Sequence, residues 1–74
     1  MSVLFLAKDK PFAREASALV ASHFSDSEVV FGETHEPFPK YLLNRSFDYV
    51  ISYVSPWIVP RQVLDNTMIA SINL

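Results

Sequence analysis

The stretch Val54–Pro60, VSPWIVP, places a stiff backbone and flat apolar side chains directly after a strand-like run. Pro56 and Pro60 restrict the backbone, so the amide and carbonyl groups between them can be held at fixed angles. Trp57 and Ile58 add apolar contact surface. Such a corner suits a planar heterocycle whose edge forms hydrogen bonds. The alternative is structural, with Trp57 plugging the edge of a sheet, and the residues by themselves leave both interpretations open.

Two lysines, Lys8 and Lys10, follow the first strand-like run and precede a helical pattern. Ammonium groups near a helix N-terminus can attract an anionic group of a substrate. A solvated turn is the simpler interpretation of so short a motif. The turn has none of the glycines of a dinucleotide fingerprint, which argues against a nicotinamide or flavin site.

The histidines do not form a metal motif. His35 lies between Glu33 and Glu36, but no partner ligands stand at a recognised spacing, so we expect an exposed loop histidine. His23 falls on the apolar face of the helical pattern, where we expect a packing role. The chain has no cysteine, which excludes disulfides and thiolate metal sites.

The composition indicates a single soluble domain. The 74 residues carry a net charge of −2, and no Lys/Arg run suggests a nucleic-acid or membrane surface. The N-terminus lacks the features of a signal peptide, so we expect a cytoplasmic protein. Because ordering costs about 1.5 kcal/mol per residue, break-even needs roughly 4,400 Å² of apolar burial. This requirement predicts that the chain either forms part of a larger hydrophobic core or associates with another chain.

Four short apolar runs predict strands, at Val3–Ala7, Glu28–Phe31, Tyr49–Val54 and Met68–Ile72. None alternates cleanly between polar and apolar residues, which indicates a parallel sheet covered on both faces. Residues 11–24 predict an amphipathic helix, and residues 60–67 a short helix with Pro60 at its first position. The expected buried face of the first helix carries Phe12, Ala16, Leu19, Val20 and His23.

The order of these elements predicts the α/β class, as a partial Rossmann-like, mostly parallel open sheet of about four strands. Between the second and third strands, Pro37 and Pro39 forbid a continuous helix, although residues 40–44 can form a turn or two. Ligands of open α/β sheets bind at the carboxyl ends of the strands. That rule selects the turns after the first and third strands and the end of the fourth.

Residues 47–74, FDYVISYVSPWIVPRQVLDNTMIASINL, resemble the N-terminal domain of the folate-dependent formyltransferases. That family includes glycinamide ribonucleotide, methionyl-tRNA and sugar N-formyltransferases. Its members carry a hydrophobic strand, a short loop ending in an apolar-Pro pair, a short helix, and a strand ending in Asn-x-His. The corresponding pieces here are YVISYV, SPWIVP, RQVLDN and IASIN, whereas the first half of the chain matches only loosely.

The resemblance implies that the loop after the third strand cradles the pterin ring of 10-formyltetrahydrofolate, largely through backbone groups. The residues that would form this cradle are Val54, Ser55, Pro56, Trp57 and Ile58. Pro56 has no backbone N–H and cannot donate a hydrogen bond to the ring. Its carbonyl would have to accept one instead.

The resemblance also implies that Asn73 is catalytic. An amine attacks the formyl carbon through a tetrahedral intermediate, and a positioned amide N–H₂ can stabilise its developing negative charge. The family further uses a histidine two residues later and an aspartate beyond it. Leu74 is the last residue given, and His23 and His35 lie in the wrong elements. We therefore expect residues 1–74 to be the incomplete N-terminal half of a formyltransferase domain, inactive by itself.

The implied parent activity is transfer of a formyl group from 10-formyltetrahydrofolate to a small-molecule amine, without a metal or NAD. The alternative is a non-catalytic α/β module that binds a partner or a second copy through the uncovered fourth strand. A receiver-like or flavodoxin-like domain is disfavoured. A receiver needs an acidic cluster after the first strand and an aspartate ending the third, where this chain has Asp9 and Val54-Ser55.

Overall fold

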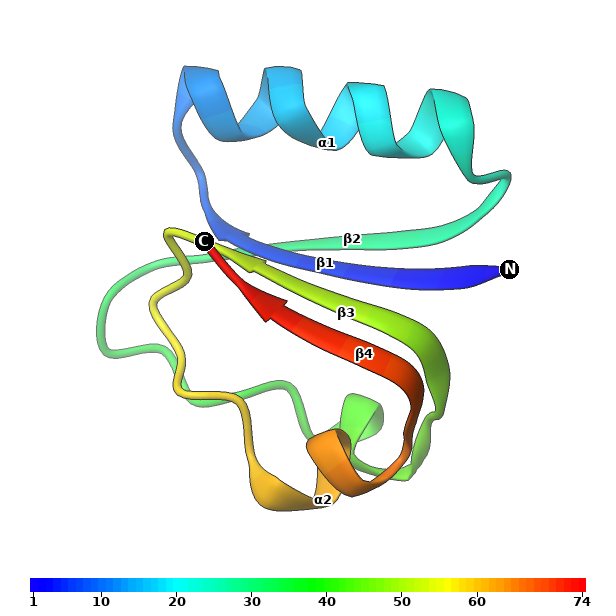
Figure 1. Cartoon of the computed structure of the whole chain (residues 1–74). Coiled ribbons are helices and arrows are strands. Elements are labelled where there is room, and N and C mark those ends of the chain that lie inside the picture. Colours follow the sequence, from blue (N-terminus) through cyan, green and yellow to red (C-terminus); the bar gives the residue numbers. More distant parts are fainter.

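A computed structural model describes all 74 residues of the chain and shows one parallel sheet with the strand order β2-β1-β3-β4. The strands are β1 (Ser2–Lys8), β2 (Asp26–Gly32), β3 (Phe47–Tyr53) and β4 (Thr67–Asn73). Helix α1 (Pro11–His23) covers one face, and the 3₁₀ helix η1 (Lys40–Asn44) and helix α2 (Arg61–Asp65) lie on the other (Figure 1). The expected partial Rossmann-like α/β fold is confirmed.

The central strand β1 is buried on both faces, as its uninterrupted apolar run predicts. Its residues Val3 to Ala7 are each at most 2 % exposed. At the amino end of the sheet, the Asp48 carboxylate accepts the backbone N–H of Ser2 at 2.9 Å, and the Ser2 hydroxyl accepts the backbone N–H of Asp48 at 3.0 Å. These two bonds tie the starts of β1 and β3 together.

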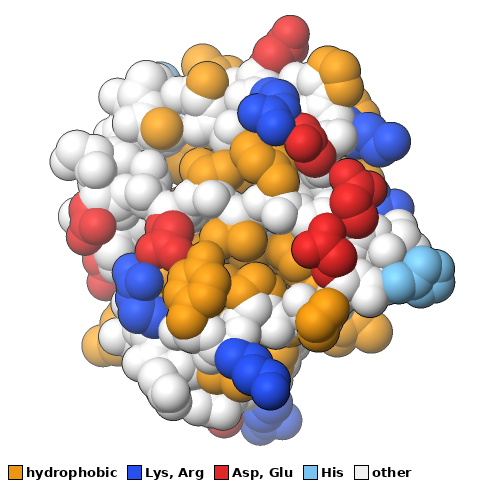
Figure 2. All heavy atoms as spheres, turned by 180° about the vertical axis from the view of Figure 1, so that it is seen from behind, with side chains coloured by type: hydrophobic (Ala, Val, Ile, Leu, Met, Phe, Trp, Pro, Cys, Tyr) orange, Lys and Arg blue, Asp and Glu red, His pale blue; other side chains and the backbone are white.

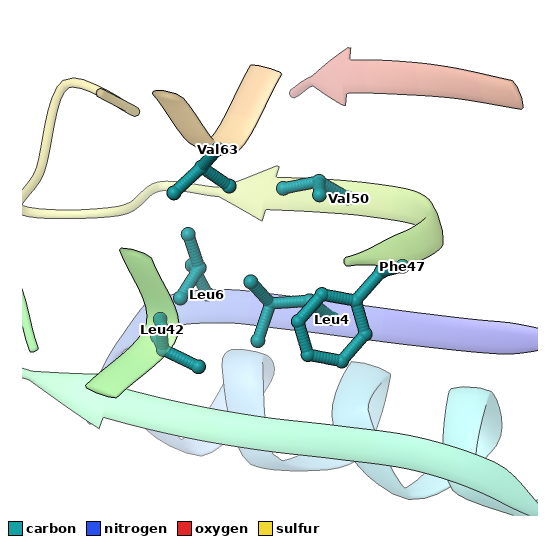
Figure 3. Packing of buried hydrophobic residues seen from close by; sticks show 6 residues of the cluster. All are labelled: Leu4, Leu6, Leu42, Phe47, Val50 and Val63. Atoms are coloured by element: carbon teal, nitrogen blue, oxygen red, sulfur yellow. The ribbon is translucent and has the colours of Figure 1, made fainter. Parts of the chain in front are cut away.

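The larger core cluster lies between the sheet and the η1–α2 layer. Side chains from β1, β3, η1 and α2 converge there (Figure 3). They are Leu4, Leu6, Leu42, Phe47, Val50 and Val63. This cluster therefore holds α2, and with it the loop that precedes α2, against β1 and β3.

On the opposite face, the predicted buried side of α1 is only partly correct. Ala16 and Val20 are partly buried against the sheet, as expected, and Ala13 and Ser17 are buried. Phe12 and Leu19 are 46 % and 64 % exposed, and His23 is exposed. Helix α1 packs mainly against β1 and β2, and Phe12 meets Tyr53 of β3 edge-on, with ring centroids 5.8 Å apart. No second helix lies over β3 and β4 on this face (Figure 1).

Two boundaries near the corner also differ from expectation. Strand β3 ends at Tyr53, because Val54 adopts a left-handed backbone with φ 47°. Pro60 is the N-cap of α2, with φ −61° and ψ 147°, and is not its first helical residue. Neither helix is long and apolar enough to cross a membrane.

Candidate functional site

A pocket of about 370 Å³ lies where β3 and β4 end, within the size range typical of small-molecule sites. It brings together four of the residues singled out from the sequence, which are Ser55, Trp57, Ile58 and Asn73. The other residues that line it are Ser52, Val59, Leu64 and Ser71. The corner after β3 and the end of β4 therefore share one cavity at the carboxyl edge of the sheet.

The corner is shaped by a serine turn. The Ser55 hydroxyl accepts the backbone N–H of Trp57 at 3.0 Å, the local bond by which serine initiates turns. Pro56 and Pro60 restrict the backbone on either side of it. The loop is consequently held by its own bonds and by prolines, and it does not depend on a ligand to adopt this shape.

Trp57 packs at the end of the edge strand β2 and also lines the pocket. Its indole N–H donates to the Glu36 carbonyl at 2.9 Å, and its ring packs edge-on against Phe38, with centroids 5.8 Å apart. The ring lies so close to Gly32 that a Cβ there would overlap the Cζ2 and Cη2 atoms. Because the N–H is already bonded, Trp57 can offer a pocket ligand only its apolar surface.

Ile58 is the most exposed large hydrophobic residue of the chain, at 95 %. It lines the pocket next to Trp57. A single exposed isoleucine is ordinary on a protein surface. Here it stands at the mouth of a cavity, where a bound ring would cover it.

Val54 and Pro56 do not line the pocket. The Val54 N–H donates to the Leu74 carbonyl and the Val54 carbonyl accepts the Lys8 N–H, both at 3.2 Å. These bonds hold the loop against β1 and the end of β4. Val54 was predicted to contact the ligand, but it positions the loop instead. Its backbone N–H already donates to Leu74 and is not available to a ligand.

The register of β4 decides which of its side chains enter the pocket. Phe47 faces Thr67, but Tyr49 faces Ala70, so β4 contains one extra residue between these pairs. Beyond this bulge, Asn73 faces Ser52, and the Leu74 N–H donates to the Ser52 carbonyl at 2.8 Å. Without the extra residue, apolar Ile72 would take that place, because a one-residue slip exchanges the two faces of a strand.

Neither Lys8 nor Lys10 lines the pocket. Lys10 is the N-cap of α1. Between the lysines, the Asp9 carboxylate accepts two bonds from the Arg14 guanidinium, at 2.6 and 2.9 Å. This bond lowers the pKa of Asp9 from its ordinary value. The turn is thus charged and, at Asp9 and Lys10, exposed, and its link to the corner is the backbone bond from Lys8 to Val54.

The histidines lie apart from the pocket as well. His35 is exposed in a turn with φ 79°, and the neighbouring Glu36 carboxylate accepts the Glu33 backbone N–H at 2.7 Å. His23, at the end of α1, has Nδ1 2.9 Å from the Leu19 carbonyl. The structure contains no group of three or more His, Asp or Glu side chains placed to hold a metal ion.

The lining of the pocket is half apolar and half polar. Apolar contact comes from Trp57, Ile58, Val59 and Leu64, and hydroxyl and amide groups come from Ser52, Ser55, Ser71 and Asn73. No charged side chain lines it. Comparison of the chain with family models, curated proteins and solved structures gives no match.

Sequence reasoning missed Ser52 and Ser71. Both are single serines within apolar strand runs, where a small polar residue attracts little attention. The signal that could have identified them is position, because both lie near the carboxyl ends of strands, where open α/β sheets bind ligands. Their shared face also depends on the bulge in β4, which the sequence does not reveal.

Proposed function

We propose that this pocket binds the pterin ring of 10-formyltetrahydrofolate, as part of a site that transfers a formyl group to a small amine. The observation that carries the proposal is the meeting of the proline-bounded corner and Asn73 in one cavity. These segments are separated by α2 and most of β4, and they are the two that the formyltransferase resemblance singles out. A lining that combines apolar side chains with hydroxyl and amide groups also suits a flat heterocycle with a hydrogen-bonding edge.

In this proposal, Trp57 and Ile58 cover the face of the ring. Asn73 stands at the end of β4, where its amide N–H₂ can donate to the formyl oxygen as negative charge develops there. The histidine and aspartate used by the formyltransferases are not assigned to any residue here. The role proposed for residues 1–74 is therefore ligand binding and one contact to the reacting group.

The test is a titration with 5-formyltetrahydrofolate, a non-reacting isomer of the formyl donor. Trp57 is the only tryptophan, so its fluorescence, corrected for absorption by the ligand, should be quenched to saturation. Ile58→Ala should weaken binding about tenfold, because burying an isoleucine is worth about 1.5–3 kcal/mol. An unquenched signal from folded protein would contradict the proposal.

Two further variants distinguish the loss of a ligand contact from a general loss of folding. Leu19→Ala removes a similar side chain from α1, remote from the pocket lining, and should leave the affinity unchanged. Asn73→Ala should reduce binding less than Ile58→Ala does. The Asn73 amide is proposed to stabilise negative charge on the formyl oxygen, and that charge forms only during the reaction.

A second candidate function, association with another copy of this chain, is favoured by the open edge of β4. Residues 67–74 include no charged residue or proline. Four of their side chains are large, hydrophobic and exposed, namely Met68, Ile69, Ile72 and Leu74. Natural sheets usually protect such edges with charge, proline or a covering element.

The opposite edge is protected in that way. Strand β2 carries Asp26 and Glu28, and Arg45 pairs with Glu28 at 2.9 Å. Charged side chains of both signs surround the hydrophobic ones in the view from behind (Figure 2). The contrast between the two edges makes β4 the strand through which a second copy would add.

A further inference from the structure

The chain has two buried serines, and they differ in one respect. Ser17 is 8 % exposed and its hydroxyl donates to the Arg14 carbonyl at 2.8 Å. Ser52 is 5 % exposed, and no protein group in the structure bonds its hydroxyl. Every fully enclosed side-chain nitrogen or oxygen in the molecule has a partner. The Ser52 hydroxyl must therefore reach open space, and the cavity that Ser52 lines is the pocket.

Ser52 is a polar residue at a mostly buried position. It shares its face of β3 with Val50, which belongs to the main cluster beneath α2. Because its hydroxyl reaches the pocket and makes no hydrogen bond to the protein, the hydroxyl adds no such bond to the stability of the fold. Alanine at position 52 should therefore leave the stability nearly unchanged.

We infer that Ser52 is a specificity-determining residue, whose hydroxyl bonds the polar edge of a planar ligand at the floor of the pocket. The inference rests on the proposed function for the identity of that ligand, a pterin. Ser52 faces Asn73 across the β3–β4 ladder, and Ser71 precedes Asn73 by two residues on the same side of β4. These three side chains, here called the polar strip, line the same pocket as the apolar surface of Trp57.

On this inference, the polar strip lets the pocket select among flat ligands by the hydrogen bonds that their edges can form. A hydroxyl donates one hydrogen bond and accepts others, so Ser52 can pair with either an oxo group or a ring nitrogen. A ligand without such an edge would leave the hydroxyl unpaired after water is expelled, which weakens binding. An apolar aromatic of equal size should therefore bind less well than a pterin.

The experiment compares Ser52→Ala, Ser52→Thr and the matched control Ser17→Ala in affinity for 5-formyltetrahydrofolate and in melting temperature. Ser52→Ala should weaken binding about tenfold, near the upper end for one neutral hydrogen bond, while its melting temperature stays nearly unchanged. Ser52→Thr keeps the hydroxyl and should bind more tightly than Ser52→Ala. Ser17→Ala should bind as the original chain does.

The outcomes distinguish this inference from the proposed function. If the original chain binds and Ser52→Ala binds equally well, the inference is overturned and the pterin site stands. Weaker binding together with a lower melting temperature, and an equal loss in Ser17→Ala, would assign Ser52 a structural role and overturn the inference. If the original chain does not bind 5-formyltetrahydrofolate, both proposals fail.

Discussion

Val54 adopts a backbone conformation that its own side chain disfavours. Its φ of 47° lies in the left-handed region, where a β-branched residue is strained by about 1–3 kcal/mol. Its N–H and carbonyl are both bonded, to Leu74 and Lys8, and these bonds hold it in place. The sharp turn at Val54 is what directs the next residues of the corner, from Ser55 to Ile58, towards the end of β4.

Val54→Gly should therefore stabilise the fold. Glycine adopts positive φ without steric cost, and Val54 is already 45 % exposed, so little packing is lost. We expect a gain of about 1 kcal/mol, which raises the melting temperature by about 4–8 °C for a domain of this size. Thermal denaturation followed by circular dichroism measures the change, and a lower melting temperature would show that the valine is not strained.

At the residue scale, sequence reasoning found the apolar wall better than the polar one. Trp57 and Ile58 stand out between prolines, and their place in the pocket follows from the rule that ligands bind at strand ends. Ser52 could not be identified, because its importance lies in a missing hydrogen-bond partner, which only coordinates reveal. Val54 was assigned to the strand because valine ordinarily extends a strand and rarely ends it in a left-handed turn.

At the scale of elements, the loop before α2 and the end of β2 fit together through one contact. Gly32 ends β2, and only the absence of a side chain there lets the Trp57 ring lie against it. The ring is also held by the Glu36 carbonyl and by Phe38. The corner therefore depends on a strand two positions away in the sheet.

Gly32→Ala should destabilise the protein by about 1–3 kcal/mol, the usual cost of forcing an extra methyl group into a packed site. The atoms in the way belong to the six-membered part of the indole. In a double variant with Trp57→Phe, whose side chain is shorter, the cost of the alanine should be smaller. Chemical denaturation of the single and double variants measures this coupling. Strictly additive losses would contradict the proposed contact.

The strands could be predicted, but the expectation that helices cover both faces of the sheet was wrong at β4, most of whose residues are exposed. Apolar residues at Phe12 and Leu19 fall on a helical face, which ordinarily means burial. No second helix lies beside α1, so Leu19 stays exposed and Phe12 is only half covered, by Tyr53. A sequence pattern gives the apolar face of a helix, but whether another element covers that face depends on the rest of the structure.

At the scale of the whole molecule, the surface area is ordinary and the stability margin is narrow. The accessible surface is 4703 Å², close to the roughly 4,600 Å² expected for a compact chain of this mass. Folding removes roughly 7,500 Å² from water, relative to the extended chain. Break-even needs roughly 4,400 Å² of that area to be apolar, which is well over half. Covering further apolar surface would therefore stabilise the fold substantially.

Self-association through β4 would provide such cover. We expect the sedimentation coefficient to rise with protein concentration, and Ile69→Lys to raise the dimer dissociation constant at least about tenfold, because an edge lysine opposes strand addition. Leu19→Lys places the same charge on α1, remote from β4, and should leave the association unchanged. A chain that sediments as a monomer at every concentration would rule out this candidate function.

The central claim is that the pocket between the corner and β4 binds a pterin. The most direct measurement is a ¹⁵N–¹H NMR titration of the 74-residue chain with 5-formyltetrahydrofolate. We predict saturable shifts at Ser52, at residues 55–59 and at residues 71–73, with the single indole resonance of Trp57 among them, while α1 stays unaffected. An unchanged spectrum, or shifts confined to α1, would contradict the account.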